Sequence, residues 1–185
     1  MVNRPVTCLV TDYGGTISLD RIDHVIGQKP VDPEAAAALR VLHDDLGMRL
    51  VLGSNTQPHE TRWPALQQAG IDGLFAAAVL SYSLGVRKPS PVFYQVVLAA
   101  AGCPAGQVLF VGDHLENDAA APARHGMQAA LVRWLRSPRI AEAFTAIERR
   151  CERSAQPAGR PTRFRRSAIS RTTAGGRMRH GPASA

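Results

Sequence analysis

Short apolar runs alternate along this chain with segments whose apolar residues recur at helical spacing, and this alternation limits the folds available to it. Apolar runs of about four to eight residues bounded by turn signals are typical of buried parallel strands. Strands that alternate with helices favour a doubly wound, three-layer α/β fold of Rossmann-like type, with a parallel sheet and helices on both faces. We expect strands at residues 6–11, 49–53, 76–80, 108–111 and 129–132, and helices at 33–46, 58–69, 90–101, 119–125 and 138–150.

The distribution of charge divides the chain into two parts. Residues 1–148 hold 12 Lys and Arg against 14 Asp and Glu, whereas residues 149–185 hold ten arginines and one acid. The net charge of +7 therefore belongs to the end of the chain. We expect one core domain at 1–150, with a short lid at 18–32, where the sequence is polar, and a disordered arginine-rich tail at 151–185.

Three explanations of this tail stay open. A solvated, disordered terminus is favoured. Its arginines could also bind the phosphates of a nucleic acid by charge alone. Phe164 is the single aromatic residue after position 150, so stacking on bases is not expected. A third explanation is the bias of GC-rich coding DNA towards Arg, Ala, Gly, Pro and Ser.

The cysteines and the apolar stretches indicate a cytoplasmic protein. Cys8, Cys103 and Cys151 have no paired spacing, and Cys8 is expected to be a buried free thiol in the first strand. Arg4 and Pro5 interrupt the apolar residues at the N-terminus, which is unlike a signal peptide. No apolar stretch approaches the roughly 18 residues of a membrane span, so no membrane contact is expected.

Polar residues gather where the expected strands end or the expected helices begin. In a doubly wound sheet the carboxyl ends of the strands meet at one edge, where ligands bind. Taken singly, each residue is explained as a turn residue, a helix cap or a solvated charge. Taken together, carboxylates suit Mg²⁺, while a lysine and a hydroxyl suit a phosphate group. The residues are Asp12 with Thr16, Ser54 with Asn55, Lys88, and Asp113 with Asn117 and Asp118.

Four segments, in this order, resemble the four motifs of the haloacid dehalogenase superfamily, a group of mostly Mg²⁺-dependent phosphohydrolases. They are LVTDYGGT at 9–16, LVLGSN at 50–55, GVRKP at 85–89 and VGDHLEND at 111–118. The resemblance spans about residues 6–132. It implies that Asp12 is the nucleophile, that Ser54 and Asn55 bind the substrate phosphate, and that Lys88 binds it and stabilises charge. The implied reaction hydrolyses a phosphate ester or anhydride through an aspartyl-phosphate on Asp12.

The resemblance also implies a Mg²⁺ site. Its ligands would be the carboxylates of Asp12 and Asp113, the backbone carbonyl of Gly14, and Asp118, either directly or through water. The dehalogenases of the superfamily need no metal, so Asp113 and Asp118 favour the phosphatase branch.

The sequence departs from the family pattern at Gly14. Phosphatase members usually carry an aspartate there, which protonates the leaving oxygen and then activates water, help typically worth about 10²–10⁴ in rate. Three consequences stay open. The protein is a slow phosphatase, or another group such as His114 or Glu116 replaces the missing acid, or the site binds a phosphorylated ligand or partner without turnover.

The motif spacing indicates an open site. Asp12 and Ser54 are 42 positions apart, and Ser54 and Lys88 are 34 apart, which leaves no room for a cap domain of ordinary size. The site is therefore expected to be capless or minimally capped. It could accept a small or a bulky phosphorylated substrate, or be covered by a second copy in a homo-oligomer.

Overall fold

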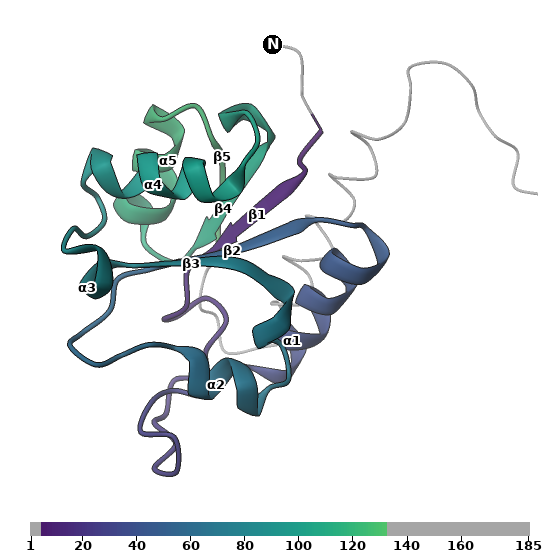
Figure 1. Ribbon diagram of the computed structural model, residues 1–185, viewed down its shortest axis with the longest axis vertical. Helices are drawn as coiled ribbons and strands as arrows, with labels where there is room; N and C mark the ends of the chain where they lie inside the picture. The colour runs from purple at the N-terminus through teal and green to yellow at the C-terminus, as the bar shows by residue number, and fades with distance from the viewer. Residues whose placement is uncertain (1–4, 133–185) are drawn as a thin grey trace, which may run out of the picture.

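A computed structural model describes residues 5–132, in which five parallel strands form one sheet of order β3-β2-β1-β4-β5 (Figure 1). The central strand β1 pairs with β2 on one side and β4 on the other, so its carboxyl end lies in the middle of one sheet edge. The strands are β1 Cys8–Thr11, β2 Arg49–Ser54, β3 Phe75–Leu80, β4 Val108–Gly112 and β5 Gln128–Leu131.

Helices cover both faces of this sheet, which confirms the predicted doubly wound α/β fold (Figure 1). One face packs Leu39 and Leu66, from α1 and α2, against alternate residues of β1, β2 and β4. The other face packs Phe93 and Val97, from α4, against the intervening residues. This burial on both sides explains why the strands read as continuous apolar runs. The helices are α1 Pro33–Arg40, α2 Trp63–Gln68, α3 Ser81–Leu84, α4 Pro91–Ala101 and α5 Ala121–Arg124.

The helix predicted at 33–46 is present, but its last turn is wider than an α-helix. Asp32 caps its start by accepting a hydrogen bond from the Glu34 N–H (2.8 Å), with Pro33 in the first turn. After α1 the chain continues as a π-helical turn, Val41–Asp45. A second π-helical turn, Leu115–Ala120, leads into α5, so the helical segment after β4 begins before the predicted residue 119.

The helix predicted at 58–69 starts later than expected. His59 and Arg62 have φ values of 67° and 66°, in the left-handed region that an α-helix of L-residues does not use. Residues 55–62 therefore form a loop, and α2 begins at Trp63. The predicted start at Pro58 is wrong because proline marks a first helical turn only where the following residues are right-handed.

Residues 18–31, between β1 and α1, form a small hairpin next to α2, where the Gln68 Nε2 donates to Asp23 Oδ2 (3.2 Å; Figure 1). Antiparallel bridges join Ser18 to Val31 and Asp23 to Gln28. Val25 is 91% exposed in the turn between them. A lid function for this segment stays a prediction. The helix predicted at 138–150 and the tail at 151–185 lie outside the described residues.

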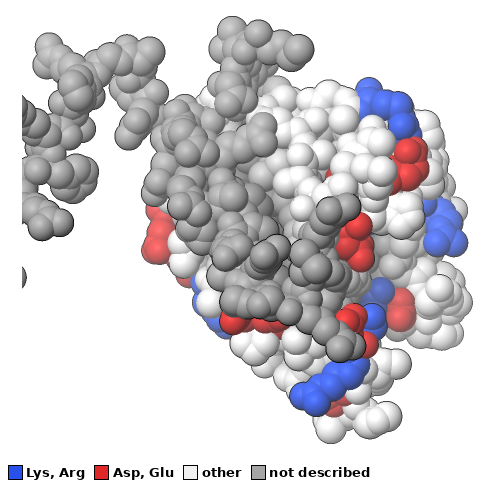
Figure 2. Space-filling view, turned by 180° about the vertical axis from the view of Figure 1, so that it is seen from behind, with Lys and Arg blue, Asp and Glu red and all other residues white. Residues whose placement is uncertain are grey.

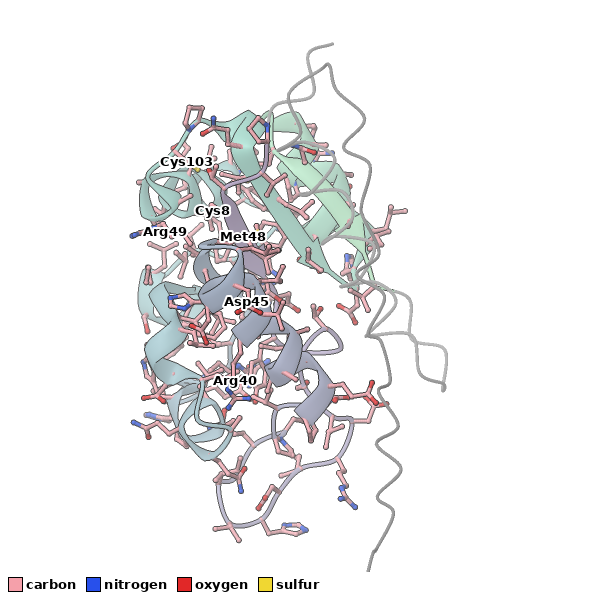
Figure 3. The ribbon with its side chains drawn as sticks, turned by 90° about the vertical axis from the view of Figure 1, so that its right-hand side faces the viewer. Cys8, Arg40, Asp45, Met48, Arg49 and Cys103 are labelled. Atoms are coloured by element: carbon pink, nitrogen blue, oxygen red, sulfur yellow. The ribbon has the colours of Figure 1, made fainter. Side chains whose placement is uncertain are left out.

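The cysteines lie at the end of the sheet opposite the carboxyl ends of the strands. Cys8 starts β1 opposite Arg49 of β2, and Figure 3 shows Cys103 beside them. Cys8 and Cys103 are free, and burial raises the pKa of Cys8 to about 12, which keeps its thiol protonated. The buried free thiol predicted for Cys8 is confirmed, whereas Cys151 lies outside the described residues.

Two further observations concern the surface charge and the helices of residues 5–132. On the face seen in Figure 2, acidic and basic side chains are interspersed among uncharged ones wherever the surface is not grey. Within residues 5–132, no helix has both the length and the apolar character that crossing a membrane requires.

Candidate active site

The predicted site residues meet at the carboxyl edge of the sheet. Asp12 directly follows β1, Ser54 is the last residue of β2, and Asp113 directly follows β4. Asp118 comes from the π-helical turn after β4. Lys88 reaches the same place from the loop between α3 and α4. The expectation that these residues converge is therefore met by the topology of the sheet.

Lys88 is the centre of this cluster. Its Nζ donates hydrogen bonds to Asp12 Oδ1 (2.9 Å), to Asp118 Oδ1 (2.7 Å) and to the carbonyl oxygen of Gly53 (2.9 Å). The residue is only 3% exposed, and these bonds match the three protons of an ammonium group. A buried ammonium is tolerated because opposite charges surround it. Lys88 thus holds the nucleophile candidate and a metal-ligand candidate in fixed positions.

Three carboxyl groups crowd around this single cation. Asp12, Asp113 and Asp118 can each direct one oxygen to a common region, with these atoms within 4.8 Å of one another. Partial desolvation, followed by the charges of Asp12 and Asp118, raises the pKa of Asp113, although the residue as a whole is exposed. Burial is also the main cause of the raised pKa of Asp118, although Lys88 opposes it. A hard divalent cation would relieve this repulsion, so the donor set fits Mg²⁺.

The Asp118 carboxyl group depends on a glycine for its place. A Cβ atom on Gly112 would lie 2.2 Å from the Cγ of Asp118, which leaves no room for any other residue at the end of β4. The other carboxyl oxygen, Oδ2, accepts a hydrogen bond from the His114 N–H (3.0 Å). The carboxylate is therefore packed against the backbone on one side and bound to Lys88 on the other.

Asn55 joins two loops of the site. Its Oδ1 accepts a hydrogen bond from the backbone N–H of Lys88 (2.9 Å), and its Nδ2 donates to the backbone carbonyl of Lys88 (3.2 Å). This reciprocal pair holds the backbone of the lysine loop against the end of β2. The Oγ of the neighbouring Ser54 donates to the carbonyl of Asn55 (3.3 Å) in a buried position. The phosphate contacts assigned to Ser54 and Asn55 stay predictions.

The turn after β1 has open space at Gly14, the position where the resemblance implies an aspartate in phosphatase members. The backbone N–H groups of Thr16, Ile17 and Ser18 all point to the carbonyl of Tyr13, which makes a tight turn. A Cβ atom added to Gly14 would have no neighbour within 4 Å beyond the adjoining residues. The absence of a side chain at Gly14 is therefore not required by packing. A metal contact from its carbonyl stays a prediction.

His114 and Glu116, the two residues that could replace the acid implied at position 14, both interact with neighbouring residues. His114 Nδ1 accepts a hydrogen bond from the Asn117 N–H (3.3 Å) and caps the π-helical turn. Glu116 forms an ion pair with Arg124, whose hydrogen bond lowers the pKa of Glu116. A carboxyl group held in its ionised form is a poor proton donor, so Glu116 is poorly suited to this role.

Family comparison agrees with this geometry. The sequence pattern of the haloacid dehalogenase-like hydrolases matches residues 6–126, about two thirds of the chain. The chain belongs to this family. Its membership accounts for the α/β fold and for the order of the four motifs on the sheet edge.

Individual relatives match at lower similarity. A glyceraldehyde 3-phosphate phosphatase from Methanopyrus kandleri is 31% identical over 72 residues, which cover 39% of this chain and 31% of that protein. The chain thus matches less than a third of this relative's length. An uncharacterized protein from Corynebacterium glutamicum has a similar structure, with a TM-score of 0.60 and 20% identity over 80% of this chain and 96% of its own. A HAD-like family hydrolase from Porphyromonas gingivalis gives a TM-score of 0.62 and 18% identity, covering 78% and 98%.

One residue beside the site, Arg62, was not anticipated from the sequence of this family member. Its guanidinium lies 4.7 Å from the centre of the Tyr13 ring, and Nη2 donates to Glu60 (2.9 Å) and to the carbonyl of Asn55 (3.4 Å). Only 8% of Arg62 is exposed. Burial, opposed by Arg62, raises the pKa of Tyr13 to about 12. Arg62 thus ties the 55–62 loop to the turn that follows the nucleophile candidate. No local pattern in the sequence links these distant residues.

Proposed function

We propose that this protein is a Mg²⁺-dependent phosphatase that works through an aspartyl-phosphate on Asp12. The observation that carries the proposal is the buried Lys88, bonded to both Asp12 and Asp118 beside a third carboxyl group, Asp113. Asp12, Asp113 and Asp118 would hold the metal, which would offset negative charge on the phosphate group. The similarity of one segment to a glyceraldehyde 3-phosphate phosphatase supports phosphate esters as the substrate class.

In the proposed reaction, Asp12 forms a bond to phosphorus while the bond from phosphorus to the leaving oxygen breaks. Lys88 holds Oδ1 of Asp12 (2.9 Å), and Oδ2 would be the oxygen that attacks phosphorus. Lys88 also offsets the charge that develops on the phosphoryl oxygens. Water then attacks phosphorus in the acyl-phosphate, and the carboxylate of Asp12 leaves as inorganic phosphate forms.

Gly14 sets which substrates react fastest in this scheme. A leaving oxygen that departs without a proton, as in acyl and aryl phosphates, does not need the missing acid. An alkyl alkoxide needs one and leaves slowly. We therefore expect acyl phosphates to be the better substrates.

The test is release of inorganic phosphate from acetyl phosphate, 4-nitrophenyl phosphate and alkyl phosphates, with Mg²⁺ and with excess chelator. Release should need Mg²⁺ and should be lost in Asp12→Asn. Asp20→Asn, which changes an exposed carboxylate of the hairpin, is the matched control and should keep the activity. Absence of release from every member of the panel would refute the proposal.

A second function is favoured by Gly14 alone, namely Mg²⁺-dependent binding of a phosphorylated ligand without turnover. In that case wild-type protein would bind but not hydrolyse, and Gly14→Asp would restore hydrolysis. Trapping of beryllium fluoride on Asp12, as a mimic of the aspartyl-phosphate, would argue against this alternative.

A further inference from the structure

A pocket of about 330 Å³ adjoins the site on the side of β3. It lies between the loop that follows β2 and the segment from α3 to Lys88, and the start of that loop passes next to α3 in Figure 1. Its walls begin one residue after Asn55 and end one residue before Lys88. The lining residues are Thr56, Gln57, Ser81, Tyr82, Gly85, Val86 and Arg87.

Hydrogen bonds hold the two walls of this pocket together. The Thr56 N–H donates to Ser81 Oγ (2.9 Å), Ser81 Oγ donates to the Thr56 carbonyl (3.4 Å), and the Tyr82 N–H donates to Thr56 Oγ1 (3.1 Å). At the inner end, Asn55 binds the backbone of Lys88 through its reciprocal pair. The pocket is therefore preformed and fixed relative to the catalytic edge, as ligand pockets usually are.

Arg87 gives this pocket a positive charge that nothing in the described part of the chain neutralises. Within residues 5–132, the guanidinium of Arg87 forms no hydrogen bond or ion pair, although its backbone carbonyl accepts one from the Ser90 N–H (2.9 Å). Arg21, on the hairpin, is the other described arginine or lysine whose side chain is in that state. Arg87 differs from Arg21 because it lines a pocket beside the site. An unpaired guanidinium in a preformed pocket suits a planar or tetrahedral anion, to which it can donate two hydrogen bonds.

We propose that this pocket binds the end of the substrate remote from the reacting phosphate, and that Arg87 pairs there with a second anionic group. The inference rests on the proposed phosphatase function and narrows it to phosphorylated compounds that carry a further carboxylate or phosphate. Gln57 and Tyr82 line the same pocket, and their side chains are of types that can hydrogen-bond to hydroxyl groups of such a compound. The volume suits a small phosphorylated acid.

Two matched pairs of substrates test this proposal on the full-length protein with Mg²⁺. 3-Phosphoglycerate differs from glycerol 1-phosphate by a carboxylate in place of a hydroxymethyl group. Fructose 1,6-bisphosphate differs from fructose 6-phosphate by a second phosphate. The ratio of kcat/KM within each pair measures how much the additional anionic group favours the reaction. Comparison of the two ratios shows whether the pocket prefers a carboxylate or a phosphate.

We expect wild type to prefer the member with the additional anionic group in at least one pair, by about tenfold in kcat/KM. This is the preference expected from one charge-assisted hydrogen bond that solvent weakens. Arg87→Gln should reduce that ratio to near one, and Arg87→Lys should keep part of it. Arg21→Gln is the control and should keep the wild-type ratio. A wild-type ratio near one in both pairs, or a ratio unchanged in Arg87→Gln, would overturn the inference.

Binding separates this inference from the proposed function. Calorimetric titration of wild type and Arg87→Gln with 3-phosphoglycerate and with glycerol 1-phosphate, in the presence of Mg²⁺, measures their dissociation constants. These constants show the contribution of the pocket to binding, whether or not the protein hydrolyses the ligands. Arg87-dependent preference in binding with no hydrolysis would refute the phosphatase and support the pocket. Hydrolysis with no Arg87-dependent preference in either measurement would refute the pocket and leave the phosphatase.

Discussion

Restoring the missing acid with Gly14→Asp is the perturbation that most directly tests the proposed chemistry. The structure gives the substitution little steric cost, because a Cβ atom at Gly14 meets nothing within 4 Å and the backbone there is not in the left-handed region. We therefore expect the steric part of the substitution to change the free energy of unfolding by about 0.5 kcal/mol or less, as for ordinary surface substitutions. Repulsion between the new carboxylate and Asp12 and Asp113 adds a cost in the absence of Mg²⁺. The new carboxyl group would be two residues from Asp12, on the turn beside the reacting phosphate.

The expected gain depends on the leaving group. General acid–base help is worth about 10²–10⁴ in rate, which corresponds to roughly 2.7–5.4 kcal/mol of barrier. Hydrolysis of an alkyl phosphate, whose leaving oxygen needs a proton, should rise by such a factor in kcat/KM. Hydrolysis of acetyl phosphate should change much less, because its leaving group departs as a stable carboxylate.

The assay compares wild type, Gly14→Asp and Gly14→Asn on both substrates under the same Mg²⁺ concentration. Asparagine has nearly the size of aspartate but transfers no proton, so Gly14→Asn isolates the effect of shape. If Gly14→Asp exceeds neither wild type nor Gly14→Asn on the alkyl phosphate, while thermal stability and Mg²⁺ affinity are retained, the reasoning about the missing acid is refuted.

Three further predictions follow from the geometry of the site. Gly112→Ala should displace the Asp118 carboxyl group, because the added Cβ would lie 2.2 Å from Asp118 Cγ. We expect it to lower the free energy of unfolding by about 1–3 kcal/mol and to reduce kcat/KM. Gly73→Ala, at a position with open space, is the control, and equal melting temperatures for the two variants would contradict this prediction. Asn55→Ala should lower the free energy of unfolding by about 1–3 kcal/mol and reduce kcat, because the backbone N–H and carbonyl of Lys88 lose their partner. An unchanged kcat would show that these hydrogen bonds do not position Lys88 for catalysis. Because the folded-state pKa of Asp113 is raised, its contribution to the stability of the metal-free protein is present at low pH and lost as pH rises through that pKa. The rise in Tm caused by Mg²⁺ should therefore be larger at about pH 8 than at about pH 5, and an equal rise at both would speak against this linkage.

The sequence alone predicts the parts of the site that follow directly from a strand. Asp12, Ser54 and Asp113 each stand at the end of a buried apolar run, so their place on the sheet edge follows from local pattern and the parallel arrangement. The doubly wound fold could be predicted for the same reason.

The remaining features depend on contacts between distant residues. Asn55 and Lys88 are 33 positions apart, and no local signal indicates that the amide of one binds the backbone of the other. Arg62 has a left-handed backbone, so α2 begins at Trp63 and not at Pro58, where the sequence predicts its start. The need for glycine at position 112 arises only once Asp118 folds back against the strand.

The sharing of one ammonium group by two acids has a thermodynamic consequence. Because Lys88 forms ion pairs with both Asp12 and Asp118, neutralising either carboxylate changes the electrostatic energy of the other. The effects of Asp12→Asn and Asp118→Asn on stability will therefore not add, and the double variant will reveal a coupling energy between them. The three residues therefore form one electrostatic unit, and the contribution of each one to the free energy of unfolding depends on the other two.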